Sequence, residues 1–205
     1  MKDAYETHRW KKFLQSSFRL TQPSAGQTSP CSFLSAPVPS SPAFEQPVVT
    51  KPETRYSGVV DVEFGKNVIV VQPVNLYGCA IGDGSFIGPF VEIQKGAKIG
   101  KHCRVQSHSF ICELVTIGDD CFISHGAMFI NDPFVTGGPA TERDLWRQTK
   151  LGNRVSIGTN ATILPVMICD DAVIGAGAVV TKDIKEPGIY VGNPARLLRR
   201  LPATP

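Results

Sequence analysis

Residues 81–100 read "IGDGSFIGPFVEIQKGAKIG", and isoleucine recurs at every sixth position along this stretch. Extending the six-residue step in both directions gives eleven positions, of which ten are apolar and eight are isoleucine. The series is Ile69, Asn75, Ile81, Ile87, Ile93, Ile99, Val105, Ile111, Ile117, Ile123 and Phe129. A period of six fits neither the 3.6-residue period of an α-helix nor the two-residue alternation of a single strand. It predicts a coil of short strands joined by sharp turns.

A second series supports the coil, because a small or slim residue follows each of these positions from Asn75 onward by four places. The residues are Cys79, Ser85, Val91, Ala97, Cys103, Ser109, Val115, Cys121 and Ala127. Three hexads make one triangular turn, and stacked turns pair through their backbones ~4.8 Å apart. We therefore expect branched aliphatic side chains inside the coil and the small residues at its tight corners.

The six-residue series stops after Phe129 and resumes in "KLGNRVSIGTNATI", residues 150–163. The intervening residues predict a loop at 131–150 with one short helix, capped by Thr141 and packed through Trp146. The step from Ile163 to Ile168 is five residues, which we interpret as a tightened corner around Pro165. Long loops in compact domains are usually functional, so the interruption marks the predicted site.

Composition excludes several classes of protein. The chain has 205 residues and a net charge of +3, and it has neither a basic run typical of nucleic-acid binding nor an apolar run long enough to cross a membrane. Its six cysteines form no CxxC pair, so we expect no zinc site. We expect the thiols to pack in the core and the protein to be located in the reducing cytoplasm. Residues 1–54 are rich in Ser and Pro and predict a disordered tail.

Several segments resemble the hexapeptide-repeat acyltransferases. They are "IGDGSFIGPFVEIQKGAKIG", "IGTNATILP", "AVIGAGAVVTKDI" and "VGNPAR", and together they cover about residues 58–200. The resemblance implies an all-β fold, a left-handed parallel β-helix with a protruding loop. The β-helix domain is expected over 55–191, followed by a short C-terminal helix and tail over 192–205, since Asn193-Pro194 is a favourable helix start.

The run "QSHSFICELVTIGDDCFISHGAMFIND" with "GGPA" resembles the branch that N-acetylates nucleotide-linked amino-deoxysugars in surface polysaccharide biosynthesis. That resemblance implies a homotrimer with acetyl-CoA as co-substrate, bound between neighbouring coils, and no required metal. O-acetylation of a sugar hydroxyl and a non-catalytic β-helix scaffold remain alternatives. A zinc hydratase on the same coil would need three convergent histidines, which the positions of His102, His108 and His125 do not favour.

Candidate catalytic residues lie at the base of the loop. His125 and His108 are seventeen residues apart, which predicts adjacent turns on one flank of the coil. Imidazole exchanges protons near neutral pH, so His125 is the candidate general base and His108 an alternative base or a sugar contact. Asn131 is expected to stack over Glu113 and to orient the amine or the thioester carbonyl.

Candidate cofactor contacts follow from the same resemblance. We expect pantetheine to bond to backbone groups beside Ala161, Ala176 and Ala178, and the phosphates to meet the region of Thr181, Lys182 and Arg196.

Overall fold

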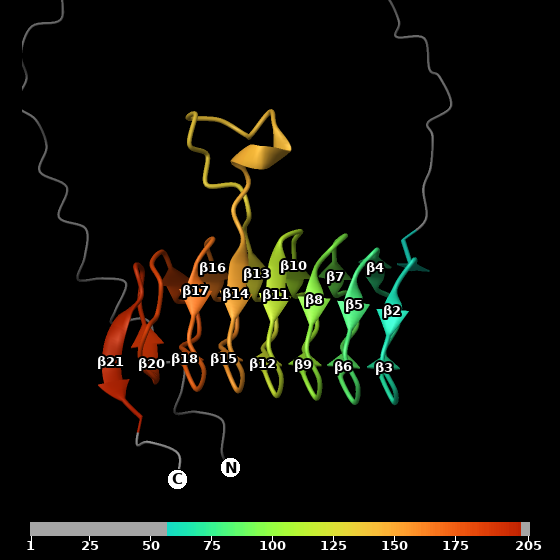
Figure 1. Ribbon diagram of the computed structural model, residues 1–205. Coiled ribbons are helices and arrows are strands. Elements are labelled where there is room, and N and C mark those ends of the chain that lie inside the picture. The colour runs from blue at the N-terminus through green and yellow to red at the C-terminus, as the bar shows by residue number, and fades with distance from the viewer. Residues whose placement is uncertain (1–56, 202–205) are drawn as a thin grey trace, which may run out of the picture. The chain divides into compact units, whose positions relative to one another are not determined.

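The computed structural model describes residues 57–201, which wind into a three-sided coil of short strands (Figure 1). Each turn contributes one strand to each of three sheets, which we call faces A, B and C. Face A has seven strands, so the coil has about seven turns. This is the arrangement expected of a left-handed parallel β-helix, and the predicted fold class is confirmed. The predicted tail at residues 1–54 lies outside the described residues.

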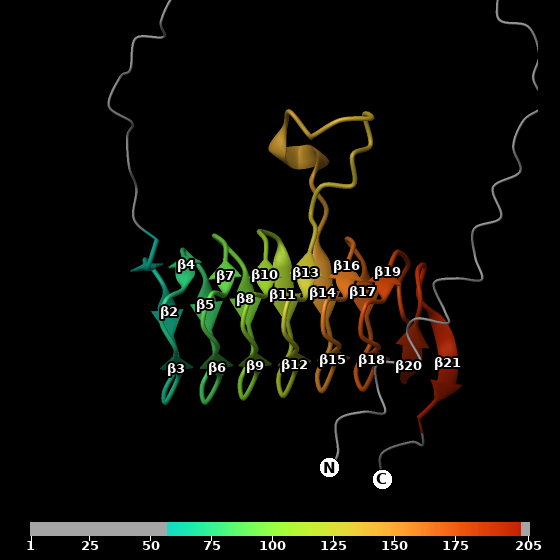
Figure 2. The same cartoon turned by 180° about the vertical axis from the view of Figure 1, so that it is seen from behind.

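Parallel pairing joins the strands from β1 to β20 to their equivalents in neighbouring turns, as Figure 2 shows from behind, and β21 adds to β20 in the antiparallel sense. Face A consists of β1 (Val59–Val60), β4 (Asn75–Tyr77), β7 (Glu92–Ile93), β10 (Phe110–Ile111), β13 (Met128–Phe129), β16 (Thr162–Ile163) and β19 (Val179–Val180). Face B consists of β2 (Glu63–Phe64), β5 (Ala80–Ile81), β8 (Lys98–Ile99), β11 (Val115–Ile117), β14 (Thr149–Leu151) and β17 (Met167–Ile168). Face C consists of β3 (Ile69–Val70), β6 (Phe86–Ile87), β9 (Arg104–Val105), β12 (Phe122–Ile123), β15 (Ser156–Ile157), β18 (Val173–Ile174), β20 (Gly188–Val191) and β21 (Arg196–Arg200). We name the corners after the faces they connect in chain order: AB, BC and CA.

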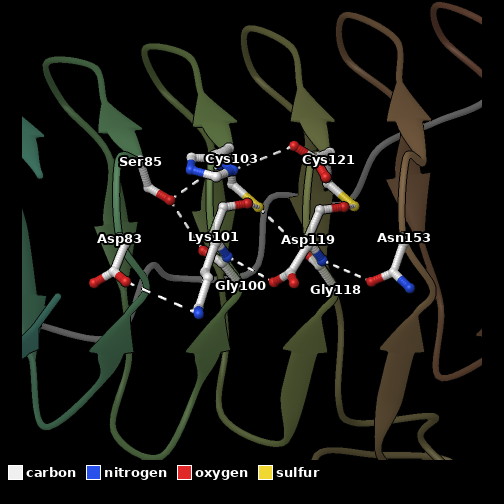
Figure 3. Close-up of polar contacts among 11 residues, drawn as sticks. Asp83, Ser85, Gly100, Lys101, Cys103, Gly118, Asp119, Cys121 and Asn153 are labelled. Atoms are coloured by element: carbon white, nitrogen blue, oxygen red, sulfur yellow. Dashed lines mark hydrogen bonds and ion pairs between the residues drawn. The ribbon is translucent and has the colours of Figure 1, made fainter. Parts of the chain in front are cut away.

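The core lies inside the coil and is built from the two predicted series. From Ile81 to Phe129 every member of the six-residue series is buried, and so is every member of the small-residue series from Cys79 to Ala127. Cys103 and Cys121 follow Ser85 in successive turns of this core (Figure 3). Their thiols donate to backbone carbonyls, Cys103 to Gly118 at 3.1 Å and Cys121 to Gly152 at 3.2 Å. The interpretation of these thiols as core residues is therefore confirmed.

Side chains at corner BC reinforce the stacking of the turns. Asp119 accepts a hydrogen bond from the backbone N–H of Lys101 at 2.7 Å, and Asn153 accepts one from the N–H of Asp119 at 2.8 Å (Figure 3). Glycine is required just before these residues: a Cβ on Gly118 would lie 2.5 Å from the carbonyl oxygen of Gly152 in the next turn. The Gly that recurs in the hexad is thus explained by close backbone approach.

The first turn departs from the predicted register. Ile69 is 59% exposed, whereas its neighbour Val70 packs against the core and Leu76, not Asn75, is fully buried. Val70 pairs with Ile87, seventeen residues on, while the turns from Ile81 to Phe129 repeat every eighteen. Because neighbouring strand residues point to opposite sides, this one-residue slip turns Ile69 and Asn75 outward. The predicted five-residue step from Ile163 to Ile168 is confirmed by the pairing of Leu151 with Ile168.

The predicted C-terminal helix is wrong. Residues 196–200 form strand β21, which pairs antiparallel with β20 across a turn containing Gly192 at φ +95°. A helix this short is marginal in water, whereas β20 ends face C and offers unpaired backbone groups. Residues 196–200 are therefore a strand because they pair with the free backbone groups at the edge of β20.

The predicted loop is confirmed: it joins β13 to β14 and projects from corner AB (Figure 1). It contains one short 3-10 helix, η1 (Arg143–Leu145). Glu142, not Thr141, lies at its N-cap and makes no side-chain capping bond, so the predicted cap is wrong. The Arg143 guanidinium lies 5.7 Å from the centroid of the Trp146 ring, which is half-buried as expected of a packing residue.

Candidate functional site

The predicted site residues fall mainly on two of the three corners. His108, His125 and Ala176 lie at corner CA, between the strands of face C and those of face A. Asn131, with Thr181 and Lys182, lies at corner AB. Within one chain, His125 precedes β13 and Asn131 follows it, so the two candidate catalytic groups lie at opposite edges of face A.

His125 is exposed and is oriented by a neighbour that sequence analysis missed. Its Nδ1 lies 2.8 Å from Oγ of Ser107, one turn earlier in the coil. When Nδ1–H donates to this hydroxyl, Nε2 carries the lone pair and is free to accept a proton. The signal was present, since Ser107 stands eighteen residues before His125, the repeat of one turn.

His108 lies one turn before His125 at the same corner, as the spacing predicted. Both turns are held by backbone bonds, from His108 N to Pro89 O and from Gly126 N to Ser107 O. The His108 ring stacks on Phe90 with ring centroids 4.9 Å apart and an interplanar angle of 10°. Sequence analysis did not identify Phe90.

Asn131 holds the base of the loop. Its Nδ2 donates to the carbonyl oxygen of Glu113 at 3.3 Å, and its own carbonyl accepts from the N–H of Arg147 at 2.8 Å. The expected stacking of Asn131 over Glu113 is therefore present. The Glu113 carboxylate forms an ion pair with Arg143 of η1, so one polar ladder fixes both the loop's entrance and its helix.

Three of the predicted cofactor residues line one cleft. Thr181, Lys182 and Arg196 border a hollow of about 240 Å³ between the turn after β19 and strand β21. Asp183 also lines this cleft, but its carboxylate is engaged by the backbone N–H of Met167 at 2.8 Å. The cleft therefore presents two exposed cations, Lys182 and Arg196, which suit phosphate groups.

The three predicted alanines divide differently. Ala176 is exposed at corner CA, on the same corner as His125. Ala161 and Ala178 are fully buried in the core, where their amides donate to the carbonyls of Gly158 and Gly175 and their own carbonyls accept from strands of the preceding turn. These two residues are in the coil's own hydrogen-bond ladder and present no side chain to a ligand.

Residues 57–201 contain no cluster of three His, Cys, Asp or Glu side chains placed to hold a metal ion. No helix within this range is long and apolar enough to cross a membrane. Burial raises the pKa of the Cys79 thiol to about 11 and that of Cys112 to about 12, so these core thiols stay protonated at neutral pH.

Comparison with protein families matches two segments of the coil. Residues 78–113 match the bacterial transferase hexapeptide model (six repeats), and residues 148–182 match the hexapeptide repeat of succinyl-transferase. The resemblance to hexapeptide-repeat transferases is therefore confirmed at the level of the repeat. The two matched segments lie on either side of the loop.

Curated relatives include the bifunctional protein GlmU from two bacteria. The protein from Clostridium botulinum Type A is 31% identical over 147 residues, which cover 67% of this chain and 32% of the relative. The protein from Streptococcus uberis is 26% identical over 160 residues, covering 72% of this chain and 35% of the relative. The chain thus spans about a third of the length of these relatives.

Solved structures with the same fold include an N-acyltransferase and an acetyltransferase. One is a mutant of AntD, an N-acyltransferase from Bacillus cereus, in complex with dTDP and coenzyme A, with a TM-score of 0.60, 24% identity, and coverage of 69% of this chain and 85% of that one. The other is a hexapeptide-repeat acetyltransferase from Vibrio cholerae in complex with acetyl coenzyme A, with a TM-score of 0.51, 24% identity, and coverage of 61% and 72%. At this level of identity the likeness establishes the fold.

Proposed function

We propose that this protein is an acetyl-CoA-dependent acetyltransferase that N-acetylates an amino-deoxysugar carried on a nucleotide, in the cytoplasmic stage of surface polysaccharide biosynthesis. The observation that carries acetyl transfer is the exposed His125 imidazole, which lies 2.8 Å from the Ser107 hydroxyl in the turn that bears the loop, and the choice of an amine acceptor rests on the resemblance to the N-acetylating branch. The hexapeptide repeats and the fold shared with AntD, whose structure contains dTDP and coenzyme A, support the substrate class.

The chemistry assigned to His125 is general base catalysis. The amino nitrogen of the sugar attacks the thioester carbonyl carbon, a C–N bond forms and the C–S bond breaks. Nε2 of His125 accepts the proton that the nitrogen loses and returns it to the departing thiolate, which leaves as free coenzyme A. Ser107 acts as a positioning residue, because its hydroxyl selects the tautomer and the direction of the ring.

The cleft at the end of the coil is the proposed contact for the phosphates of acetyl-CoA. Lys182 and Arg196 supply positive charge there, and Thr181 supplies a hydroxyl. Ala176 is exposed at corner CA and is the proposed small neighbour of the extended pantetheine. No metal is required for this reaction, since the imidazole supplies the proton transfer.

A homotrimer would bring the two halves of the site together. His125 and Asn131 lie at opposite edges of face A in one chain, so each needs a complementary corner from another copy. The loop projects away from its own coil and is tied at its base by Asn131 and Arg143. In the trimer we assign the loop the role of covering the reaction site beside a neighbour's His125. Asn131 would then orient the acceptor or the thioester carbonyl.

O-acetylation of a sugar hydroxyl is the second candidate. It is favoured by the Ser107–His125 bond itself, because a hydroxyl needs a positioned base more than a neutral amine does. Assaying His125→Ala with a sugar hydroxyl and with a sugar amine as acceptor separates the two candidates. O-acetylation should disappear, whereas N-acetylation should keep the rate at which a neutral amine reacts without a general base.

The direct test is to incubate the protein with acetyl-CoA and a panel of nucleotide-linked amino sugars and to follow free thiol. We expect release with a member of the panel, and a fall of about 10²-fold or more in kcat for His125→Ala. His102→Ala is the matched control, since His102 is also exposed at a corner but lies at corner BC near Asp120. Absence of acetyl-CoA binding would instead support a non-catalytic scaffold.

A further inference from the structure

Corner CA carries an aromatic pair that the proposed chemistry does not use. The rings of Phe90 and His108 stack face to face, with centroids 4.9 Å apart, on the two turns that precede His125. Both side chains are exposed, and 57% of Phe90 is accessible to solvent. A stacked pair exposed at the surface presents a flat apolar surface on which another ring can continue the stack.

The backbone gives no reason for phenylalanine at position 90. Phe90 has φ +60°, in the left-handed region where bulky residues are rare and glycine or asparagine is favoured. The next turn places His108 at the equivalent position, also at positive φ, and the turns after it follow the preference, with Gly126, Asn160 and Gly177. A large exposed ring in a strained backbone conformation is the kind of feature that is retained for binding rather than for folding.

A cleft of about 250 Å³ lies beside Phe90. The residues that line it include the apolar Pro73, Val74 and Phe90 and the polar Asn75 and Glu92. Glu92 is itself held by Gln94, whose Nε2 donates to one carboxylate oxygen at 3.0 Å, so its position is fixed. An apolar slot with hydrogen-bond acceptors at its margin suits a planar heterocycle that carries N–H groups on its edge.

We propose that this cleft binds the nucleobase of the nucleotide-linked substrate, with Phe90 as its stacking platform. The inference rests on the proposed function for the identity of the ligand. From Phe90 the corner runs past His108 to His125, two turns or about 10 Å away at ~4.8 Å per turn. The base would lie at Phe90, the diphosphate along His108, and the amino sugar at His125.

Charge along this path agrees with a diphosphate. Arg104 lies on the outer side of face C in the same turn as His108, with its guanidinium 5.6 Å from the centroid of the Phe86 ring. It is exposed, and within the residues described it has no acidic partner among the ion pairs. A guanidinium so placed can pair with a phosphate that passes the corner.

The test is calorimetric titration of the full chain with UDP, dTDP and GDP, and with inorganic pyrophosphate as the probe that lacks a base. We expect at least one nucleoside diphosphate to bind, and Phe90→Leu to weaken it on the order of 10- to 100-fold, because stacking on an aromatic ring is lost while apolar volume is kept. Phe90→Tyr keeps the flat ring and should bind as the wild type does. Thermal midpoints and sedimentation of both variants should match the wild type.

The outcomes are distinct. Equal affinity of Phe90→Leu and wild type for every nucleotide, or no nucleotide binding at all, would overturn the subsite. A changed oligomeric state of Phe90→Leu with unchanged nucleotide affinity would assign the ring to a contact between copies and overturn it equally. Because no acetyl-CoA is present, nucleotide binding through Phe90 in a protein that releases no thiol would overturn the proposed activity alone.

Discussion

Replacing Ser107 by alanine separates orientation of the base from the base itself. The hydroxyl makes one hydrogen bond to the imidazole of His125, at 2.8 Å, on an exposed corner. A hydrogen bond of this kind contributes a net ~0.5–1.5 kcal/mol. If that stabilisation holds the reactive tautomer and ring direction in the transition state, its loss should lower kcat about 2- to 13-fold.

The assay is thiol release from acetyl-CoA at saturating acceptor, over a range of pH. We expect Ser107→Ala to lower kcat by this modest factor with little change in KM, and to keep the fall in rate at acid pH that reports protonation of the base. His125→Ala should lose far more, and its remaining activity should no longer show that fall.

Ser124→Ala is the matched control, because it also removes a hydroxyl bond of 2.8 Å, to Thr159, in the turn that contains His125. Its kcat should stay close to that of the wild type. The reasoning is refuted if Ser107→Ala has no more effect than Ser124→Ala, or if it is as damaging as His125→Ala.

Three further predictions concern the coil, the loop and the core thiols. Gly118→Ala should lower the free energy of unfolding by ~1–3 kcal/mol in urea titration, because its methyl group would collide with the next turn, whereas Gly58→Ala, with no atom within 4 Å of the new methyl group, should be nearly neutral. Arg143→Ala breaks the ion pair with Glu113 and should make limited proteolysis within the loop faster and raise KM for the acceptor, with the thermal midpoint unchanged; equal proteolysis rates would contradict the assigned tether. Because burial raises the pKa of Cys112 to about 12, the unfolded chain loses that proton first as pH rises, so stability should fall from about pH 9 upward, and Cys112→Ala should flatten this fall in thermal scans.

The sequence was most informative where the chain is most regular. The isoleucine series shows which side chains point inward. Each hexad forms one side of the triangular coil, so its buried residue recurs at the same place on every side. The core from Ile81 to Phe129 could therefore be predicted residue by residue, and so could the loop that interrupts it. Periodicity is strong information because a large number of residues repeat the same packing requirement.

The two ends of the coil could not be predicted in the same way. At the start, the slip that buries Leu76 instead of Asn75 depends on one turn of different length, which a fixed step of six cannot reveal. At the end, residues 196–200 have a sequence compatible with a helix, but pairing with the edge of β20 decides their conformation. Both outcomes are set by the neighbouring strand rather than by local sequence.

The candidate site was predictable in part. The spacing of His108 and His125 placed them at one corner, and the ladder of Asn131 over Glu113 followed from the eighteen-residue repeat. The same repeat would have identified Ser107 as the partner of His125. The burial of Ala161 and Ala178 was implied by the sequence, because they follow Ile157 and Ile174 by four residues, the spacing that defines the small-residue series inside the coil.

Subunit complementation tests the central claim most directly, namely that the acetyl-transfer site is shared by two copies of this chain. His125→Ala and Asn131→Ala, each expected to have strongly reduced activity alone on the acceptor found in the panel, are unfolded together, refolded as a mixture and assayed for thiol release. If His125 of one copy works with the loop of another, random mixing restores about a quarter of the wild-type activity, because that share of the interfaces contains both intact halves. Activity no greater than the sum of the two variants alone would contradict the shared site.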